Sequence, residues 1–358
     1  MKNKLRKCST VLFLSILISN HSNATVLLVN NAPGGPGMYV QIDDAIAAAS
    51  AGDTIYVSGN TAPYANCTID KSIVLIGPGT FAQKQNNISA KLAIININNN
   101  ITGVVIKGFN ITNGIYLDNK TNINNVQISF NHFNGYNAIY CDHLTNSANI
   151  MISSNTFDSY GNNVINFWIA TNVTNVNIEN NIITGSIYAL MVNNGIIKNN
   201  VFYNNGGAGA FSGGVYASTL YQVTNAQIIN NIFFNADPLN YTSGCVFQNN
   251  ITYSNTTTYP LLDILENNIN NTNPLFVNAP FTGGFSVSNN YHLLTGSPAI
   301  GSGLGGTDMG FYGGSNPVTY TGEVLNLPVV RQMNIINSNV PQNGNVNVKV
   351  RSTISRTN

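Results

Sequence analysis

The chain has 358 residues, of which only 8% are charged and 43% are hydrophobic. Four of its 14 basic residues lie within the first seven positions, so the remainder carries 10 basic and 13 acidic residues, a net charge of −3. This excess of acid argues against nucleic-acid binding, which depends on cations that neutralise phosphates. The hydrophobic fraction argues against a disordered polar chain, although 64 residues are Asn.

The first 24 residues predict a secretory signal peptide. Lys2, Lys4, Arg6 and Lys7 precede an apolar run at 11–18, and the small residues at 22–24 offer a cleavage site after Ala24. The run is much shorter than the ~20 residues that span a bilayer. We therefore expect a mature chain without a transmembrane segment that is secreted, periplasmic or on the outer cell surface. Its three cysteines, at 67, 141 and 245, are expected in the core.

One helix is predicted, at residues 41–50. Apolar residues recur there at helical spacing, and Gly52 follows as a terminator. The apolar stripe comprises Ile42, Ala45, Ile46 and Ala49. A stack of strands leaves open edges at its ends, so this helix is expected to cover the N-terminal end. The apolar segments at 55–57, 67–69, 73–76 and 92–95 would form the first coils.

The middle of the chain repeats the phrase apolar-x-apolar-x-x-Asn-x-apolar. Its Asn positions are 131, 155, 181, 200, 231 and 250, and Phe109 takes that place in an earlier copy, at separations of 19 to 31 residues. Alternation within each copy predicts strands rather than helices. Coils of about 22–25 residues would then stack at ~4.8 Å per rung, with inward Val, Ile and Phe forming apolar columns. Asn tolerates left-handed backbone, and stacked Asn amides hydrogen-bond along the stack.

Three parts of the chain resemble the right-handed parallel β-helix superfamily, also called pectate-lyase-like. These are the segment at 40–57, the Asn repeat, and the closing motifs at 273–276 and 296–310. Closing motifs of this kind are common in secreted bacterial β-helices. The resemblance spans roughly residues 38–314. It implies an all-β, right-handed parallel β-helix over 25–316, with the helix at 41–50 as its cap. Residues 317–358 are expected to form a short β tail of two or three strands that caps the C-terminal end or packs on the side.

A second, less regular repeat lies between the copies of the Asn phrase, and its first two copies have the sequence Ile-Tyr-x-Asp. Alternation places two columns of side chains outward. The first column is Tyr116, Tyr140, Asn166, Tyr188 and Tyr216, and the second is Asp118, Asp142, Trp168, Leu190 and Ser218. Aromatic faces stack on sugar rings, so Tyr116, Tyr140, Trp168, Tyr188 and Tyr216 are candidate contacts for a polysaccharide or cell-surface glycan. The alternative is cross-strand packing of tyrosines that stiffens the sheet.

Asp118 and Asp142 would occupy adjacent rungs, about 5 Å apart. Three roles fit this pair: a Ca²⁺ site, an acid/base pair for glycoside hydrolysis, or two solvated carboxylates. Lys120 is the one candidate base nearby, and His143 would complete a catalytic set as a proton shuttle, with His132 as a further candidate.

The absence of arginine between Arg6 and Arg331 bears on the enzymatic interpretation. The resemblance implies lyases that combine acidic Ca²⁺ ligands with an Arg or Lys base, and hydrolases or esterases that combine Asp with Arg; none of these sets is complete here. Three hypotheses stay open. The chain is a β-helix that binds polysaccharide, a polysaccharide lyase or glycoside hydrolase, or a structural spacer or adhesin, and we expect a monomer.

Overall fold

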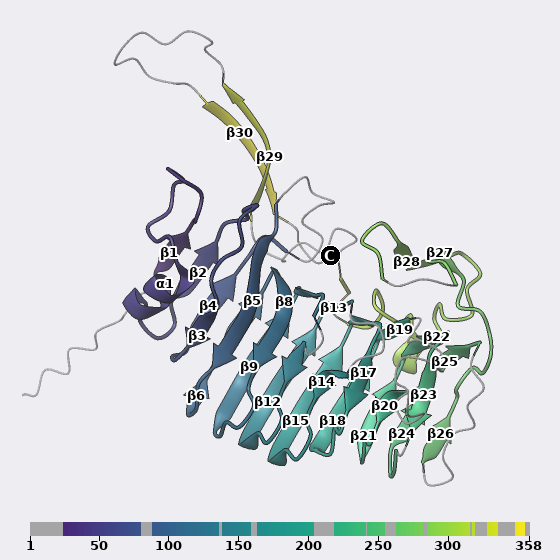
Figure 1. Cartoon of the computed structure of the whole chain (residues 1–358). Helices are drawn as coiled ribbons and strands as arrows, with labels where there is room; N and C mark the ends of the chain where they lie inside the picture. Colours follow the sequence, from purple (N-terminus) through teal and green to yellow (C-terminus); the bar gives the residue numbers. More distant parts are fainter. Residues whose placement is uncertain are drawn as a thin grey trace, which may run out of the picture.

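The computed structural model describes residues 24–79, 88–135, 138–158, 163–203, 218–240, 242–254, 263–281, 285–315, 317–318, 328–335 and 348–354. Residues 1–23 of the predicted signal peptide and Tyr216 lie outside these residues. The fold is all-β, and parallel strands form two long sheets, an arrangement consistent with a β-solenoid (Figure 1). In the described residues no helix is both long and apolar enough to cross a membrane.

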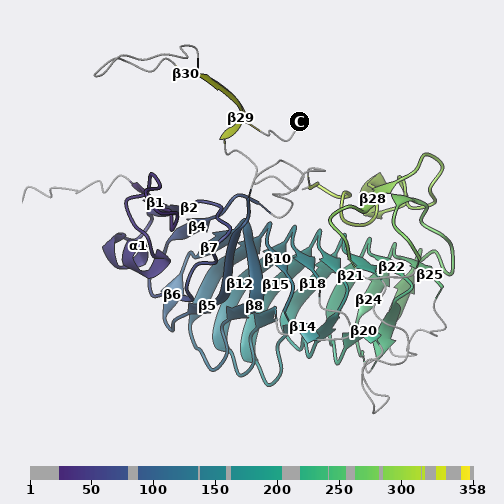
Figure 2. The ribbon, with the colours of Figure 1, turned by 45° about the horizontal axis from the view of Figure 1, so that its top comes forward.

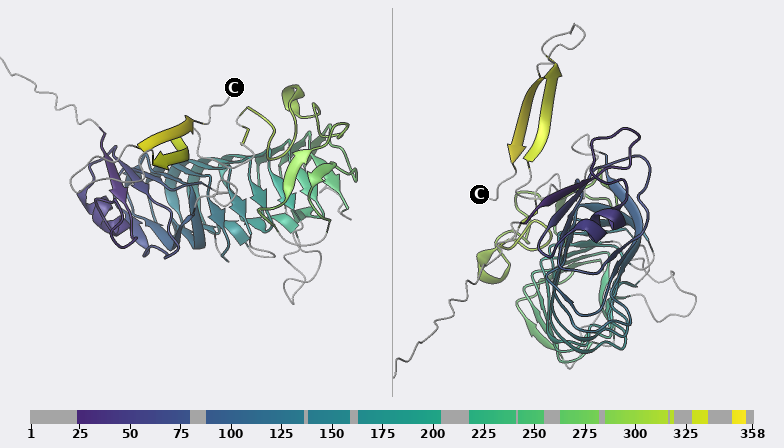
Figure 3. Two further views of the ribbon diagram at one scale, coloured as in Figure 1. Left: turned by 90° about the horizontal axis from the view of Figure 1, so that it is seen from above. Right: turned by 90° about the vertical axis from the view of Figure 1, so that its left-hand side faces the viewer.

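The first long sheet contributes one strand to each coil. Its strands in spatial order are β1 (Val26–Val29), β2 (Thr54–Val57), β4 (Val74–Ile76), β7 (Val105–Lys107), β9 (Ile123–Ser129), β12 (Thr145–Ser153), β15 (Thr171–Glu179), β18 (Asn193–Lys198), β21 (Ala226–Ile229), β24 (Val246–Gln248) and β26 (Ile264–Glu266). The short β6 (Ile101–Thr102) pairs beside β9. Figure 3 shows the coils both from the side and end-on.

The second long sheet begins with three strands and divides into two rows. The first strands are β3 (Cys67–Ile69), β5 (Ala90–Ile97) and β8 (Phe109–Tyr116). One row then contains β10 (His132–Phe133), β13 (Thr156–Phe157), β16 (Ile182–Ile183), β19 (Val201–Tyr203), β22 (Ile232–Phe234) and β25 (Ile251–Tyr253). The other contains β11 (Ile139–Tyr140), β14 (Asn163–Asn166), β17 (Ser186–Tyr188), β20 (Ser218–Tyr221) and β23 (Asp237–Asn240).

The predicted helix is present as α1 (Ile42–Ala48) and is shorter at both ends than the sequence indicates. Gln41 and Ala49 have extended backbone and flank it. The helix contacts β1, β2 and β3 and buries Ile42, Ala45 and Ile46 in the same core as the coils.

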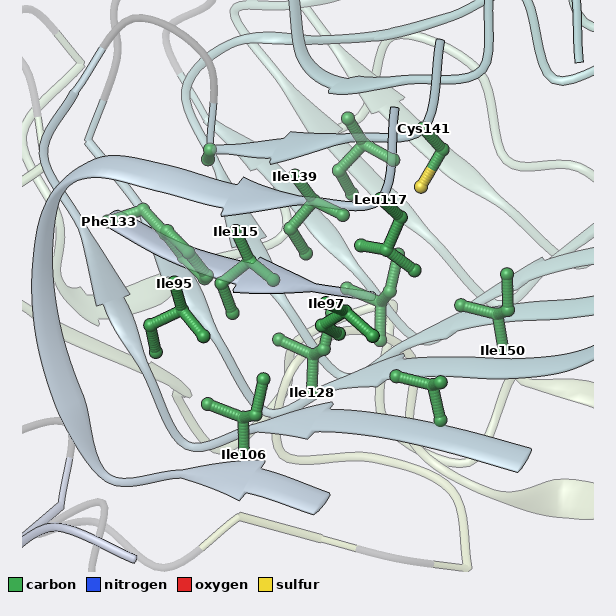
Figure 4. Packing of buried hydrophobic residues seen from close by; sticks show 14 of the residues in the cluster. Ile95, Ile97, Ile106, Ile115, Leu117, Ile128, Phe133, Ile139, Cys141 and Ile150 are labelled. Carbon is green, nitrogen blue, oxygen red and sulfur yellow. The ribbon is translucent and has the colours of Figure 1, made fainter. Parts of the chain in front are cut away.

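The core is a set of apolar columns, as the alternation predicts. Equivalent residues of successive coils pair in register and are fully buried, for example Ile106, Ile128, Ile152, Ile178, Ile197, Ile228 and Phe247. Figure 4 shows this packing around Ile106, Ile128 and Ile150. Cys67, Cys141 and Cys245 are free and buried, as expected, and burial raises the pKa of the Cys245 thiol to about 11.

The Asn residues of the repeat form a buried ladder between the two sheets. Each Asn donates from its backbone N and its Nδ2 to the Oδ1 of the Asn one coil further on, at 2.9–3.2 Å, from Asn131 through Asn250 to Asn268. Phe109 begins the ladder by donating its backbone N to Asn131. The left-handed backbone lies one residue earlier than expected, because the residue preceding each ladder Asn has the positive φ, as at Asn180 and Asn230.

A second set of asparagines holds the closing motifs against the coils. Asn180 donates through Nδ2 to the carbonyls of Phe311 and Gly313 at 2.9 and 2.8 Å, and Asn249 donates to Ser302 at 2.9 Å. The segment that they hold contains the 3₁₀ turn η2 (Leu304–Gly306), and it follows an antiparallel pair, β27 (Phe276–Asn278) and β28 (Asn290–Leu293). These parts bury a second apolar cluster on the outside of the coils.

The C-terminal tail contributes β29 (Pro328–Ile335) and β30 (Val348–Ile354), which pair antiparallel with each other. Among the described residues they pair with no strand of the long sheets, and Figure 2 shows the hairpin apart from them. The expected cap over the C-terminal end is therefore not seen in the strand pairing. At the C-terminal end of the first long sheet, the last strand is β26, and its residues Ile264 and Leu265 are exposed.

Candidate functional site

The outward tyrosine column follows the predicted register over four coils and departs from it at the fifth. Tyr116 pairs with Tyr140, and Asn166 then links Tyr140 to Tyr188. The next partner of Tyr188 is Tyr221 rather than Tyr216, so the predicted register is wrong there. The coil between β17 and β20 is longer than its neighbours, and it moves the strand five residues along the chain.

The column contains two aromatic pairs separated by Asn166. The rings of Tyr116 and Tyr140 lie 5.8 Å apart at 55°, and those of Tyr188 and Tyr221 are stacked at 5.3 Å. Asn166 and Tyr221 are buried, whereas Tyr116, Tyr140 and Tyr188 are half-buried. Cross-strand ring packing is thus present at both pairs, and the accessible part of the column lies on the earlier coils.

Within the residues that the structure describes, the second outward column extends over three coils. Asn119 N donates to the Asp142 carbonyl at 2.8 Å and His143 N to the Trp168 carbonyl at 2.9 Å, which places Asp118, Asp142 and Trp168 at equivalent positions. The prediction is wrong for Leu190, which is fully buried, and for Ser218, which lies three residues before the column residue Tyr221 rather than two residues after it.

The position of the turn explains why Leu190 leaves the column. In the earlier coils the left-handed residue comes three positions after the residue of the tyrosine column, at Asn119, His143 and Ile169. After Tyr188 the left-handed residue is the very next one, Ala189. The strand therefore ends before it can present a further outward side chain, and the residue that follows turns into the core.

Asp142 is the most connected member of this face. Its Oδ1 lies 2.9 Å from His143 Nδ1, and its Oδ2 accepts a hydrogen bond from the Tyr140 hydroxyl at 3.3 Å. Burial, followed by the negative charges of Asp142 and Asp118, raises the pKa of Tyr140. Asp118 is half-buried and accepts a hydrogen bond from Asn119 Nδ2 at 3.0 Å.

Trp168 is the exposed aromatic of the site. Its side chain is 44% exposed, and the His143 ring meets it edge-on at 6.1 Å. The structure therefore gathers Tyr116, Tyr140, Asp118, Asp142, His143 and Trp168 on neighbouring coils. We refer to these six residues as the Trp168 face.

Two other candidates do not join this arrangement. None of the described ion pairs involves Lys120, whose carbonyl accepts the backbone N of Thr145 at 2.9 Å. His132 lies in β10, in the other row of the second sheet, where its ring contacts Phe285 at 5.5 Å. His132 is therefore not a proton shuttle for Asp142.

The carboxylates do not form a calcium cage. Ca²⁺ takes about 6–8 oxygen ligands, and the described residues contain no group of three or more His, Cys, Asp or Glu side chains placed to hold a metal. Both oxygens of Asp142 already face His143 and Tyr140. The residues present do not fit a Ca²⁺ site formed by Asp118 and Asp142 alone.

A groove on the first sheet was not anticipated. It has a volume of about 250 Å³ and lies over β12, β15 and β18, with Met151, Asn177 and Ile196 on its floor. Asn149, Asn175 and Asn194 border it as an exposed amide ladder. The available signal was the pair of apolar residues, Met151 and Ile196, at outward positions of strands that are otherwise polar on that side.

His132 leads to a prediction for pH dependence. Burial lowers its pKa from 6.5 to about 4, so the unfolded chain binds the proton at higher pH than the folded chain. We expect the thermal midpoint to fall as pH is lowered from about 6.5 to 4, because protonation then favours the unfolded state. His132→Gln should flatten the profile in this window, measured by circular dichroism melts. A profile parallel to that of the parent chain would contradict this assignment.

Comparisons with known proteins assign no family. No protein-family model matches the sequence, and no curated protein matches it either.

Proposed function

We propose that the chain is a secreted or cell-surface β-helix that binds polysaccharide at the Trp168 face. The observation that carries this proposal is the exposure of the only Trp of the chain beside a polar, hydrogen-bonded cluster and a tyrosine pair. An exposed indole adds apolar surface that a soluble protein otherwise avoids. Ring faces flanked by hydroxyl and carboxylate groups suit sugars, which present C–H faces and many hydroxyls.

We also propose the handedness of the coils, the role of helix α1 and the route of export. We infer a right-handed helix of the pectate-lyase-like kind, since parallel strands joined by crossovers are almost always right-handed. Helix α1 covers the N-terminal end, a role supported by its contacts with β1, β2 and β3. The signal peptide directs the chain to the secretory route.

The charge of the face favours neutral polysaccharides. Asp118 and Asp142 are both acidic, and their only described cationic contact is the His143 imidazole, which is charged only when protonated. A uronate-rich polymer would bring further carboxylates against them, and like charges at such distances repel. Hydroxyl-rich neutral chains can instead donate hydrogen bonds to these oxygens.

Trp168→Ala is the first test. We expect the parent chain to be retarded in native gels that contain a neutral polysaccharide, and the variant to migrate as in an empty gel. Loss of a central aromatic contact typically costs about 2 kcal/mol or more, roughly 30-fold in affinity. Phe281→Ala removes another exposed ring, which lies against Tyr253, and should leave retardation unchanged. Equal retardation of the parent chain and Trp168→Ala would refute the proposed face.

One observation favours an alternative, glycoside hydrolysis. Asp142 has His143 at 2.9 Å, and Asp118 occupies the equivalent position one coil earlier. Neighbouring coils are spaced about 5 Å apart, which is comparable to the carboxyl separation in retaining enzymes. Release of reducing sugar that Asp142→Asn abolishes would establish this activity. A lyase would instead release unsaturated uronides that absorb ultraviolet light. A structural spacer or adhesin, the third hypothesis, would show neither turnover nor retardation.

A further inference from the structure

Charge is segregated along the chain to a degree that the net value conceals. From Thr25 to Glu323 there are six lysines, no arginine and 13 acidic residues, a net charge of −7. From residue 324 onward there is no acidic residue, and there are four cations: Arg331, Lys349, Arg351 and Arg356. Such asymmetry between parts of a chain is typical of a basic segment with a distinct partner.

The structure places three of these cations in the hairpin of β29 and β30. Gln332 is opposite Arg351 and Asn334 is opposite Lys349, and Arg331 falls at a register shift. These pairs alternate with two that are entirely apolar, Met333 opposite Val350 and Ile335 opposite Val348. Successive register positions of a ladder alternate between its two sides, so the sequence in this register predicts one polar, basic side and one apolar side.

This hairpin needs a partner. A two-stranded hairpin alone is marginally stable in water, and this one pairs with no other strand among the described residues. Its partner must offer negative charge for the cations and apolar contact for the other face. An acidic polysaccharide provides the first without the second, whereas the interface of an anionic bilayer provides both.

We propose that the β29–β30 hairpin docks the chain on an anionic lipid surface. The cations meet the lipid phosphates while the apolar face enters the boundary between headgroups and acyl chains. The same surface repels the strongly acidic remainder of the chain, so the coils are held away from the membrane. The Trp168 face then stays free in solution. This proposal does not depend on whether that face binds sugar.

The test is co-sedimentation of the chain from Thr25 onward with vesicles. Vesicles of phosphatidylcholine with 30% phosphatidylglycerol, about a third of the lipid, should bring down the protein at low salt, and pure phosphatidylcholine vesicles should not. The Lys349→Gln, Arg351→Gln variant should bind roughly 30-fold more weakly, since two cations near the surface are lost. Raising the salt concentration should weaken binding of the parent chain, because mobile ions screen the attraction.

A matched variant separates this effect from a general loss of charge. Lys71→Gln, Lys91→Gln removes two cations from the coils and should sediment like the parent chain. The Lys349→Gln, Arg351→Gln variant should keep the thermal midpoint of the parent chain, and the matched variant should have a midpoint close to it. Equal loss in both variants, equal binding to neutral vesicles, or no binding to either vesicle type would overturn the proposal. Retention in an acidic polysaccharide gel without vesicle binding would also overturn it, in favour of a glycan partner.

Discussion

Replacing Asn181 with Ala is expected to lower the free energy of unfolding by about 3–5 kcal/mol. Asn181 is fully buried, and its side chain serves three neighbours: Oδ1 accepts the backbone N of Asn155, while Nδ2 donates to the Ile152 carbonyl and to Asn200. Alanine leaves the backbone N–H of Asn155 without its acceptor and removes an amide donor from the Ile152 carbonyl, where water has no access, while Asn200 Oδ1 keeps only the backbone N of residue 181. The denaturant midpoint should therefore fall, with a matching fall in the thermal midpoint.

Asn175→Ala is the control for this prediction. Asn175 also belongs to an amide ladder, in which it donates to Asn149 and accepts from Asn194, but it is exposed. Water replaces its partners when it is removed, and Asn175 has a φ of 55°, which Ala tolerates less well than Asn. The expected change is therefore about 1–2 kcal/mol, most of it from the backbone. Similar losses in the two variants would mean that amide stacking itself, rather than buried polar satisfaction, stabilises the coils.

Lys198→Ala should produce the other large effect. Its ammonium lies 2.7 Å from Glu179, whose side chain is only 3% exposed, and the two residues are register partners on β15 and β18. Removing one partner of a buried ion pair typically costs about 3–5 kcal/mol. Lys198 is itself one-third exposed, so about 2–3 kcal/mol is expected after allowance for screening. Chemical denaturation of parent and variant measures this difference.

Two further variants distinguish the origin of that loss. Lys71→Ala breaks a partly exposed pair with Asp70 at 3.8 Å and two long hydrogen bonds to the carbonyls of Ala47 and Ala49, and should cost about 1 kcal/mol or less. The double change Lys198→Met, Glu179→Leu removes both charges and should recover most of the stability lost in Lys198→Ala. Failure of the double variant to recover would show that contacts other than the unpaired carboxylate dominate.

The architecture could be predicted from the Asn phrase because two independent constraints coincide there. Each ladder Asn must lie inward for its amide to reach the next coil, and the apolar residue three positions earlier must then also lie inward. Asn181 and Ile178 illustrate the pair, since both are fully buried. A period that satisfies buried hydrogen bonds and buried apolar columns together leaves little freedom for another fold.

The outward columns were less predictable because no buried group fixes them. Tyr216 and Tyr221 both follow an apolar residue, and only the pairing of Tyr221 with Tyr188 decides between them. Leu190 was misplaced because its turn begins at Ala189, two positions earlier than in the coils before it. Alternation gives the direction of a side chain only as far as the strand continues, and the sequence does not mark where these strands end.

The spacing of the ladder also determines how much variation the molecule tolerates. Asn155 bonds to Asn181 across 26 residues, Asn181 to Asn200 across 19, and Asn200 to Asn231 across 31, yet the backbone N to Oδ1 distances stay within 2.9–3.0 Å. A coil that is twelve residues longer keeps the same hydrogen bonds, because the ladder residues at its two ends hold their register. The coils thus form a scaffold onto which loops of unrelated sequence can be grafted without altering the frame that holds them.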